Sequence, residues 1–84
     1  MNSLKNLTLR WCDCITDASL IHVLNISTLQ FLSISGCRKL TGDGISNLVR
    51  HRNLKMLELT HCPNATVKVK AYLKQNLVNC ILLD

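Results

Sequence analysis

A period of 25 residues runs through the chain and constrains its fold more than any other feature. Cysteine recurs at this step, at Cys12, Cys37 and Cys62, and several other columns keep the same step. These columns are Leu4, Leu29 and Leu54; Leu7, Leu32 and Leu57; Leu9, Ile34 and Leu59; and Thr16, Thr41 and Thr66. Self-similarity at a fixed period indicates a repeat architecture, in which each unit buries its apolar side against the next.

Each unit contains a strand pattern followed by a helix pattern. The blocks LKNLTLRWC, LQFLSISGC and LKMLELTHC end in alternating apolar and polar residues, which is typical of a half-buried strand. A threonine follows each block, and its hydroxyl can accept a hydrogen bond from an unpaired backbone N–H at a helix start. Apolar residues then recur at helical spacing, so we predict helices at about 17–25, 42–51 and 67–76. Gly42 and Gly44 weaken the second of these helix starts.

Strands that alternate with helices predict an α/β fold, with a parallel sheet on one side and helices on the other. Because helices are bulkier than strands, the stack should curve with the sheet on its concave face. A last strand at 77–84 should close the sheet, since Leu77, Cys80 and Leu82 repeat the spacing of the first strand. We therefore predict one domain over residues 1–84, with repeats at about 4–28, 29–53 and 54–76 and a third step of only 23 residues.

The five cysteines admit three interpretations, of which we favour packing. Cys12-x-Cys14 and His61-Cys62 could supply metal ligands, but their spacing matches no zinc module, and the repeat spreads the cysteines along a line. Stacked units could bring Cys12 and Cys37 within disulfide range. An odd number of cysteines without a secretory signal favours free thiols in a reducing compartment, the cytoplasm or the nucleus. Small buried thiols that fill the turn after each strand account for the column.

The sequence contains no pattern for catalysis or cofactor binding. Its histidines, His22, His51 and His61, share no register with a nucleophile and a carboxylate, and a glycine-rich phosphate loop is absent. We therefore expect no enzyme activity, cofactor, metal or small-molecule ligand. The net charge of +5 is spread over separate pairs without interleaved aromatic residues, which argues against nucleic acid. No apolar run reaches the roughly 18 residues that span a bilayer, so no membrane association is expected.

Strand alternation places the residues that flank each core leucine on the concave face, in four columns. The columns are Asn6, Phe31, Met56 and Asn79; Thr8, Ser33, Glu58 and Ile81; Arg10, Ser35, Thr60 and Leu83; and Trp11, Gly36, His61 and Asp84. Large side chains such as Trp11, Phe31 and Met56 anchor protein interfaces, although Trp11 could instead cover its own loop. The predicted partner-binding residues are Arg10, Trp11, Phe31, Ser33, Met56, Glu58 and His61.

The repeat also resembles a known class. Its pattern L-x-x-L-x-L-x-x-C-x-x-(I/L)-T-(D/G) is similar to the cysteine-containing class of leucine-rich repeats, which is found mainly in F-box proteins. The chain carries this pattern as LKNLTLRWC and ITD in the first unit and as ISGC and LTGDGI in the second. The resemblance extends over the whole chain, and it implies a leucine-rich-repeat solenoid of three repeats plus a closing strand.

The resemblance also implies a function. F-box proteins of this class are substrate-recognition subunits of SCF-type, cullin-RING ubiquitin ligases. Their repeats hold the protein substrate, and a separate N-terminal F-box holds a Skp1-type adaptor. No F-box is visible in this sequence, so we expect the chain alone not to bind the adaptor and to be the C-terminal part of a longer protein or a truncated product. The alternative is a leucine-rich-repeat scaffold unrelated to ubiquitin. In either case, uncapped ends predict low stability or self-association.

Overall fold

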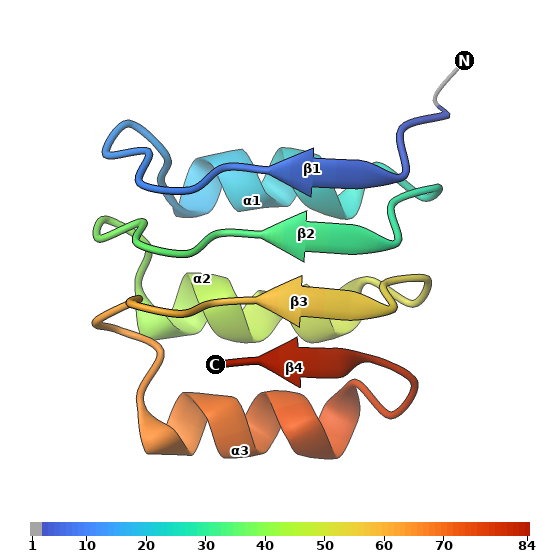
Figure 1. Cartoon of the computed structure of the whole chain (residues 1–84). Coiled ribbons are helices and arrows are strands. Elements are labelled where there is room, and N and C mark those ends of the chain that lie inside the picture. The colour runs from blue at the N-terminus through green and yellow to red at the C-terminus, as the bar shows by residue number, and fades with distance from the viewer. Residues whose placement is uncertain (1–2) are drawn as a thin grey trace.

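The computed structural model describes residues 3–84 and arranges them in two layers, a parallel sheet and a row of helices. Strands of three residues each form the sheet in chain order. They are β1 Asn6–Thr8, β2 Phe31–Ser33, β3 Met56–Glu58 and β4 Ile81–Leu83. All run in the same direction, with β1 and β4 at opposite edges of the sheet (Figure 1). The predicted α/β fold with a parallel sheet is therefore confirmed.

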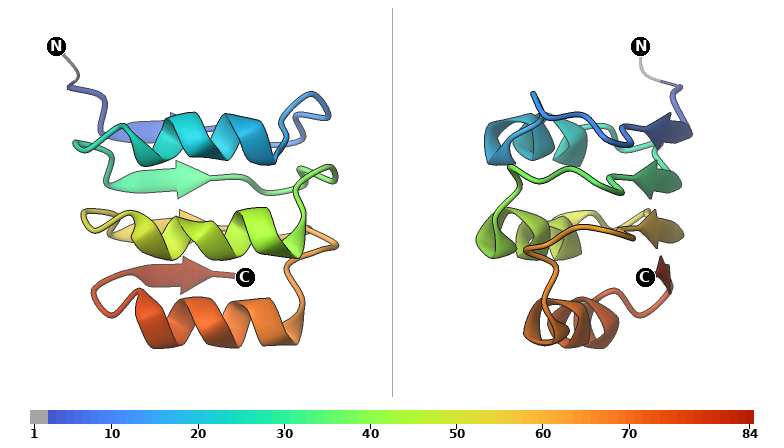
Figure 2. Two further views of the ribbon diagram at one scale, coloured as in Figure 1. Left: turned by 180° about the vertical axis from the view of Figure 1, so that it is seen from behind. Right: turned by 60° about the vertical axis from the view of Figure 1, so that its left-hand side comes forward.

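The helices all lie on one side of the sheet (Figure 2). They are α1 Asp17–Leu24, α2 Gly42–Ser46 and α3 Val67–Asn76, and α2 continues into the 3-10 helix η1 Asn47–Arg50. The three predicted helical ranges agree with these bounds to within one residue, although the second range is divided between an α-helix and a 3-10 helix. Right-handed crossovers of this kind connect parallel strands and place every helix on the same face of the sheet.

Threonines begin the helices, as the repeat predicts. Thr41 Oγ1 accepts a hydrogen bond from the backbone N of Gly44 at 3.2 Å, and Thr66 Oγ1 accepts one from Val69 at 3.3 Å. At the first helix the Thr16 backbone N donates to Ser19 Oγ at 3.3 Å. These bonds satisfy backbone groups that have no partner within the first helical turn.

Gly44 is fixed by its neighbour in the preceding unit. The Asp17 carboxylate accepts hydrogen bonds from the Thr41 backbone N at 2.9 Å and from the Thr41 hydroxyl. A Cβ at position 44 would overlap this carboxylate, so a side chain there would displace it. The glycine that weakens the second helix therefore allows α1 to be linked to the start of α2.

Neighbouring strands pair at a constant 25-residue step, which includes the last strand. Leu57 pairs with Leu82 and Met56 with Ile81, so the predicted third step of 23 residues, with Cys80 in the core column, is wrong. Leu77 does not open the closing strand but caps the C-terminus of α3, where it is buried. Helix α3 has 10 residues, two more than α1, and the segment that connects it to the next strand has four residues, two fewer than the segment after α1. The length of helix plus connecting segment is therefore the same in both units.

The core lies between the sheet and the helices and is almost entirely aliphatic. Its most deeply buried members come from the middle of the stack, where a unit packs between two neighbours. The hydrophobic core residues with no exposed surface are Leu29, Leu32, Ile34, Leu40, Ile45, Leu48, Leu57, Leu59 and Leu73. Partly buried residues from the ends pack against this cluster, among them Leu7, Ile15 and Leu82.

Side chains also link each unit to the carbonyl groups of the unit before it. The Cys37 thiol donates to the Leu9 carbonyl at 2.8 Å, and the Cys62 thiol donates to the Ile34 carbonyl at 3.0 Å. Buried His51 places Nε2 at 2.8 Å from the Ile26 carbonyl. The amides of Asn53 and Asn64 donate in the same direction, to the Ser27 and Leu40 carbonyls, and the Thr28 hydroxyl donates to the Leu4 carbonyl within the first unit. These bonds help to satisfy backbone carbonyls outside the helix and strand ladders; at Ile26 and Ile34 they add to a backbone N–H bond that the carbonyl also accepts.

Candidate functional site

The sheet surface that faces away from the helices, hereafter the outer sheet face, carries a row of apolar side chains. Phe31, Met56 and Ile81 occupy matching positions on β2, β3 and β4. Since side chains alternate along a strand, they point away from the core leucines that follow them. Phe31 and Met56 are half-buried, and Ile81 is 59% exposed. With strands about 4.8 Å apart, the three side chains form one continuous apolar row.

A polar cluster lies beside this row and spans the first three strands. Arg10 Nη2 donates to Glu58 Oε1 at 2.6 Å, and Arg10 Nε donates to the same oxygen at 3.0 Å. The Ser33 hydroxyl, which is also 3.2 Å from Arg10 Nε, donates to Glu58 Oε1 at 2.7 Å. The Ser33 hydrogen bond and the Arg10 guanidinium together hold the pKa of the Glu58 carboxyl below its usual value. Arg10 and Glu58 therefore present a fixed, charge-compensated pair.

Ser33 supports this pair but cannot contact a partner. Its side chain has no exposed surface, because Arg10 and Glu58 cover it. The expectation that Ser33 belongs to the binding surface is therefore wrong. The sequence placed it on the correct side of its strand, but a small residue between two long side chains becomes covered by them.

An aromatic pair marks the end of the outer sheet face where the strands lead into the helices. The rings of Trp11 and His61 are stacked, with centroids 5.6 Å apart and an interplanar angle of 26°. Trp11, Gly36 and His61 occupy equivalent positions and share positive φ angles of 59°, 75° and 62°. A Cβ at Gly36 would overlap the Trp11 indole, so glycine lets the ring cross the middle unit to reach His61.

Trp11 therefore covers neighbouring units and not its own loop. Its side chain is 63% exposed, although it is stacked on His61. An indole held at a fixed place with most of its surface in water provides a large apolar contact area at low entropic cost. The open alternative, that Trp11 packs over its own strand end, does not describe this geometry.

Four of the five cysteines lie in the core or pack against it, and Cys14 is exposed. All five are free thiols, and burial raises the pKa of Cys37, Cys62 and Cys80. The buried pair Cys37 and Cys62 donate to backbone carbonyls of the preceding unit, as expected for small thiols that fill the turns. Between residues 3 and 84, no group of three or more His, Cys, Asp or Glu side chains is placed to hold a metal ion.

The structure brings most of the predicted binding residues onto one surface. Phe31 and Met56 lie in the apolar row, Arg10 and Glu58 form the charged pair, and Trp11 stacks on His61. Ile81 and Leu83 also belong to this face, in the columns of Met56 and Glu58. The sequence-based columns instead grouped Ile81 with Glu58 and Leu83 with Thr60. An unbroken 25-residue step, counted forward from β3, would have assigned both correctly.

The chain matches no model of a known protein family. In the part of the chain that the structure describes, no helix is long and apolar enough to cross a membrane. The function is therefore inferred from the chemistry of the outer sheet face and from the sequence pattern.

Proposed function

We propose that the chain is a leucine-rich-repeat solenoid module that binds a protein partner through the outer sheet face. The observation that carries this proposal is the apolar row of Phe31, Met56 and Ile81, together with the exposed Trp11. Contiguous apolar side chains on the surface of a sheet cost solvation free energy unless a partner covers them. Full burial of one such side chain contributes about 1.5–3 kcal/mol, so a few of them can anchor an interface.

The charged pair of Arg10 and Glu58 can fix the orientation of a bound partner, which apolar contacts alone do not. Arg10 is held by Glu58 yet remains about half exposed, so its remaining N–H groups can donate to a partner. A guanidinium that is already fixed loses little side-chain entropy on binding. Apolar anchors next to an oriented polar group are the usual composition of a specific protein interface.

We propose further that the partner is the substrate of an SCF-type ubiquitin ligase, and that these repeats recognise it for ubiquitin-dependent degradation. The support comes from the sequence pattern, which resembles the cysteine-containing repeats of F-box proteins. A surface with anchors and no catalytic constellation is suited to a subunit that holds a substrate while other subunits transfer ubiquitin. The Skp1-type adaptor would be bound by an F-box and not by residues 3–84.

The binding surface can be tested with matched double variants. Tagged chain is used to capture partners, which are identified by mass spectrometry, and each is then tested against two variants. Phe31→Ala with Met56→Ala should reduce capture of the true partner at least about tenfold, because both anchors are lost. Ile21→Ala with Val67→Ala removes two exposed apolar side chains from the helix layer and should leave capture unchanged. Equal capture by both variants would exclude the outer sheet face.

The ubiquitin role needs a separate measurement on the captured partner. Its ubiquitylation and lifetime are compared in cells with and without this protein, and with and without a proteasome inhibitor. A substrate should become longer-lived and less ubiquitylated when this protein is removed. A partner that binds through Phe31 and Met56 but keeps the same lifetime would identify the chain as a scaffold unrelated to ubiquitin.

A further inference from the structure

Lysine and arginine side chains that form no ion pair within the described residues lie together at one edge of the molecule. We call it the helix-to-strand edge, because it is formed by the segments that lead from each helix into the next strand, at 25–30, 51–55 and 77–80. Residues 3–5, which precede β1, lie at the same edge. It is the right-hand side of Figure 1. Its cations are Lys5, Arg52 and Lys55, together with Arg50 at the end of η1, and within the described residues none of them forms an ion pair.

The carboxylates lie elsewhere. Asp13, Asp17 and Asp43 lie in the turns and helix starts at the opposite edge, and Glu58 is paired with Arg10. Asp84 lies within 4.0 Å of Lys70 and Lys74. The described part of the helix-to-strand edge therefore contains no acidic side chain, and its positive potential is uncompensated. Such a patch attracts negatively charged partners over a distance of roughly 8–10 Å at moderate salt.

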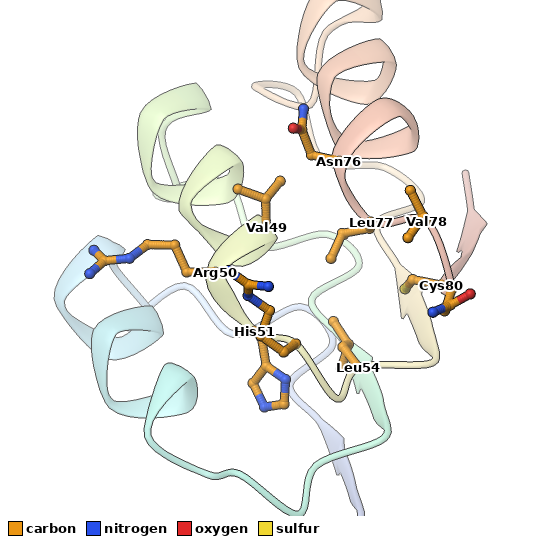
Figure 3. A pocket seen from close by; sticks show the side chains of 10 residues that line it. Val49, Arg50, His51, Leu54, Asn76, Leu77, Val78 and Cys80 are labelled. Carbon is orange, nitrogen blue, oxygen red and sulfur yellow. The ribbon is translucent and has the colours of Figure 1, made fainter.

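Two adjoining cavities open at the same edge. The larger one, of about 720 Å³, lies between the segment after η1 and the segment after α3. Figure 3 shows Val49, Leu54 and Leu77 around this space, with the Arg50 side chain extending away from them. Its lining is mixed, because polar side chains such as His51 and Asn76 alternate with these aliphatic ones, and exposed Val78 lies at its margin.

The second cavity continues the first toward the sheet. It has a volume of about 680 Å³, and Arg52, Leu54 and Asn79 line both. It extends to Lys55 and to Ile81 on the outer sheet face. The two spaces together make a groove of mixed lining, in which aliphatic side chains lie beside three cations that form no ion pair, Arg50, Arg52 and Lys55.

We propose that this groove binds a short acidic peptide segment of a protein partner. Carboxylates of the segment pair with Arg52 and Lys55, and aliphatic side chains next to them occupy the space between Val49, Leu54 and Leu77. Aliphatic side chains beside the cations favour a peptide over a nucleic acid, because no Phe, Tyr or Trp lines either cavity to stack on a base. The groove meets the apolar row only at Ile81 and does not include Phe31 or Met56, so the proposal does not depend on the function proposed for that row.

The experiment uses the full chain and two labelled peptides of the same length. One alternates Leu and Val with Asp and Glu, and the other carries Asn and Gln in place of the acids. Fluorescence anisotropy should show binding of the acidic peptide, and its affinity should fall as salt is raised from about 50 to about 300 mM. The amide peptide should bind at least about tenfold more weakly, because it cannot form charged pairs. Equal affinities for the two peptides would overturn the proposal.

Charge-matched variants locate the site. Arg52→Glu with Lys55→Glu should weaken binding of the acidic peptide at least about tenfold through like-charge repulsion. Lys39→Glu with Lys68→Glu changes the net charge equally at the opposite edge, where both lysines are also unpaired, and should have little effect. Circular dichroism verifies that both variants are folded. Equal weakening by both variants, or tighter binding of a single-stranded oligonucleotide than of the acidic peptide, would contradict the proposed site.

Discussion

The first and second units share one sequence pattern, yet the structure buries them to different degrees. Leu32, Ile34 and Leu40 of the second unit have no exposed surface. Their equivalents in the first unit, Leu7, Leu9 and Ile15, are only half-buried. The second unit packs between two neighbours, whereas the first has a neighbour on one side. Burial in this fold therefore comes from stacking and not from the residue itself.

The cysteine column shows the same difference. The Cys37 thiol reaches back 2.8 Å to the Leu9 carbonyl of the first unit. Among residues 3–84, the Cys12 thiol donates to the Arg10 carbonyl of its own turn, at 3.6 Å, and to no other carbonyl. The side-chain bonds to the preceding unit therefore tie the second unit to the first, and the same residue type contributes differently by position.

The largest expected effect concerns the core leucines. Leu32→Ala should lower the free energy of unfolding by about 3–5 kcal/mol, because a closed cavity remains between two neighbouring units. Leu7→Ala should cost only about 1–2 kcal/mol, because solvent already reaches the site and the surroundings can relax. Urea denaturation with equal m-values measures both. Equal losses would show that the first unit is buried as deeply as the second in solution.

A smaller difference is expected between the two cysteines. Cys37→Ala should cost about 1–2 kcal/mol, since it removes a buried side chain and leaves the Leu9 carbonyl without the thiol donor. Cys12→Ala should cost less than about 0.5 kcal/mol, because Cys12 is only partly buried and bonds within its own turn. Both are compared with the parent chain by thermal unfolding in the presence of a reducing agent. A larger cost at Cys12 would contradict the role assigned to stacking.

The smallest effect concerns the pair that joins the first unit to the third, Arg10 and Glu58. The folded-state pKa of Glu58 is lowered, so its contribution to stability is fully present above the ordinary value of about 4.3 and is lost as the pH falls through the folded value. Glu58→Gln should therefore slightly lower the melting temperature at pH 7, and the difference from the parent chain should disappear under acidic conditions. A difference that persists unchanged at pH 2–3 (roughly two units below ordinary carboxyl values) would assign the effect to packing.

Much of the fold could be predicted, because the 25-residue period fixes the pairing of β1, β2 and β3. The threonine starts and the helix bounds also follow from local pattern. The last strand could not be placed, because Leu77, Cys80 and Leu82 repeat the spacing of a strand by coincidence. Whether Leu77 ends a helix or opens a strand depends on the length of α3, which local spacing does not determine.

The sequence predicts which residues share a column on the outer sheet face, but not which of their side chains contact one another. Alternation put Phe31 and Met56 on the outer sheet face. Alternation does not show that other side chains cover Ser33. It also does not show that the Trp11 ring crosses Gly36 to stack on His61. Nor does it show that Arg10 pairs with Glu58, which lies 48 residues away in the sequence. Those outcomes depend on the directions of long side chains across three strands. The unpaired cations of the helix-to-strand edge were visible in the sequence, but their separation from every carboxylate emerges only from the fold.

The most direct test of the central claim is site-specific photo-crosslinking to the partner. A photoreactive phenylalanine derivative is placed at Met56, on the outer sheet face, or at Val67, which is highly exposed at the start of α3. If the outer sheet face binds the partner, the chain modified at Met56 should form a covalent adduct with the partner and the chain modified at Val67 should not. An adduct from Val67 alone, or equal adducts from both positions, would contradict the assignment of this face.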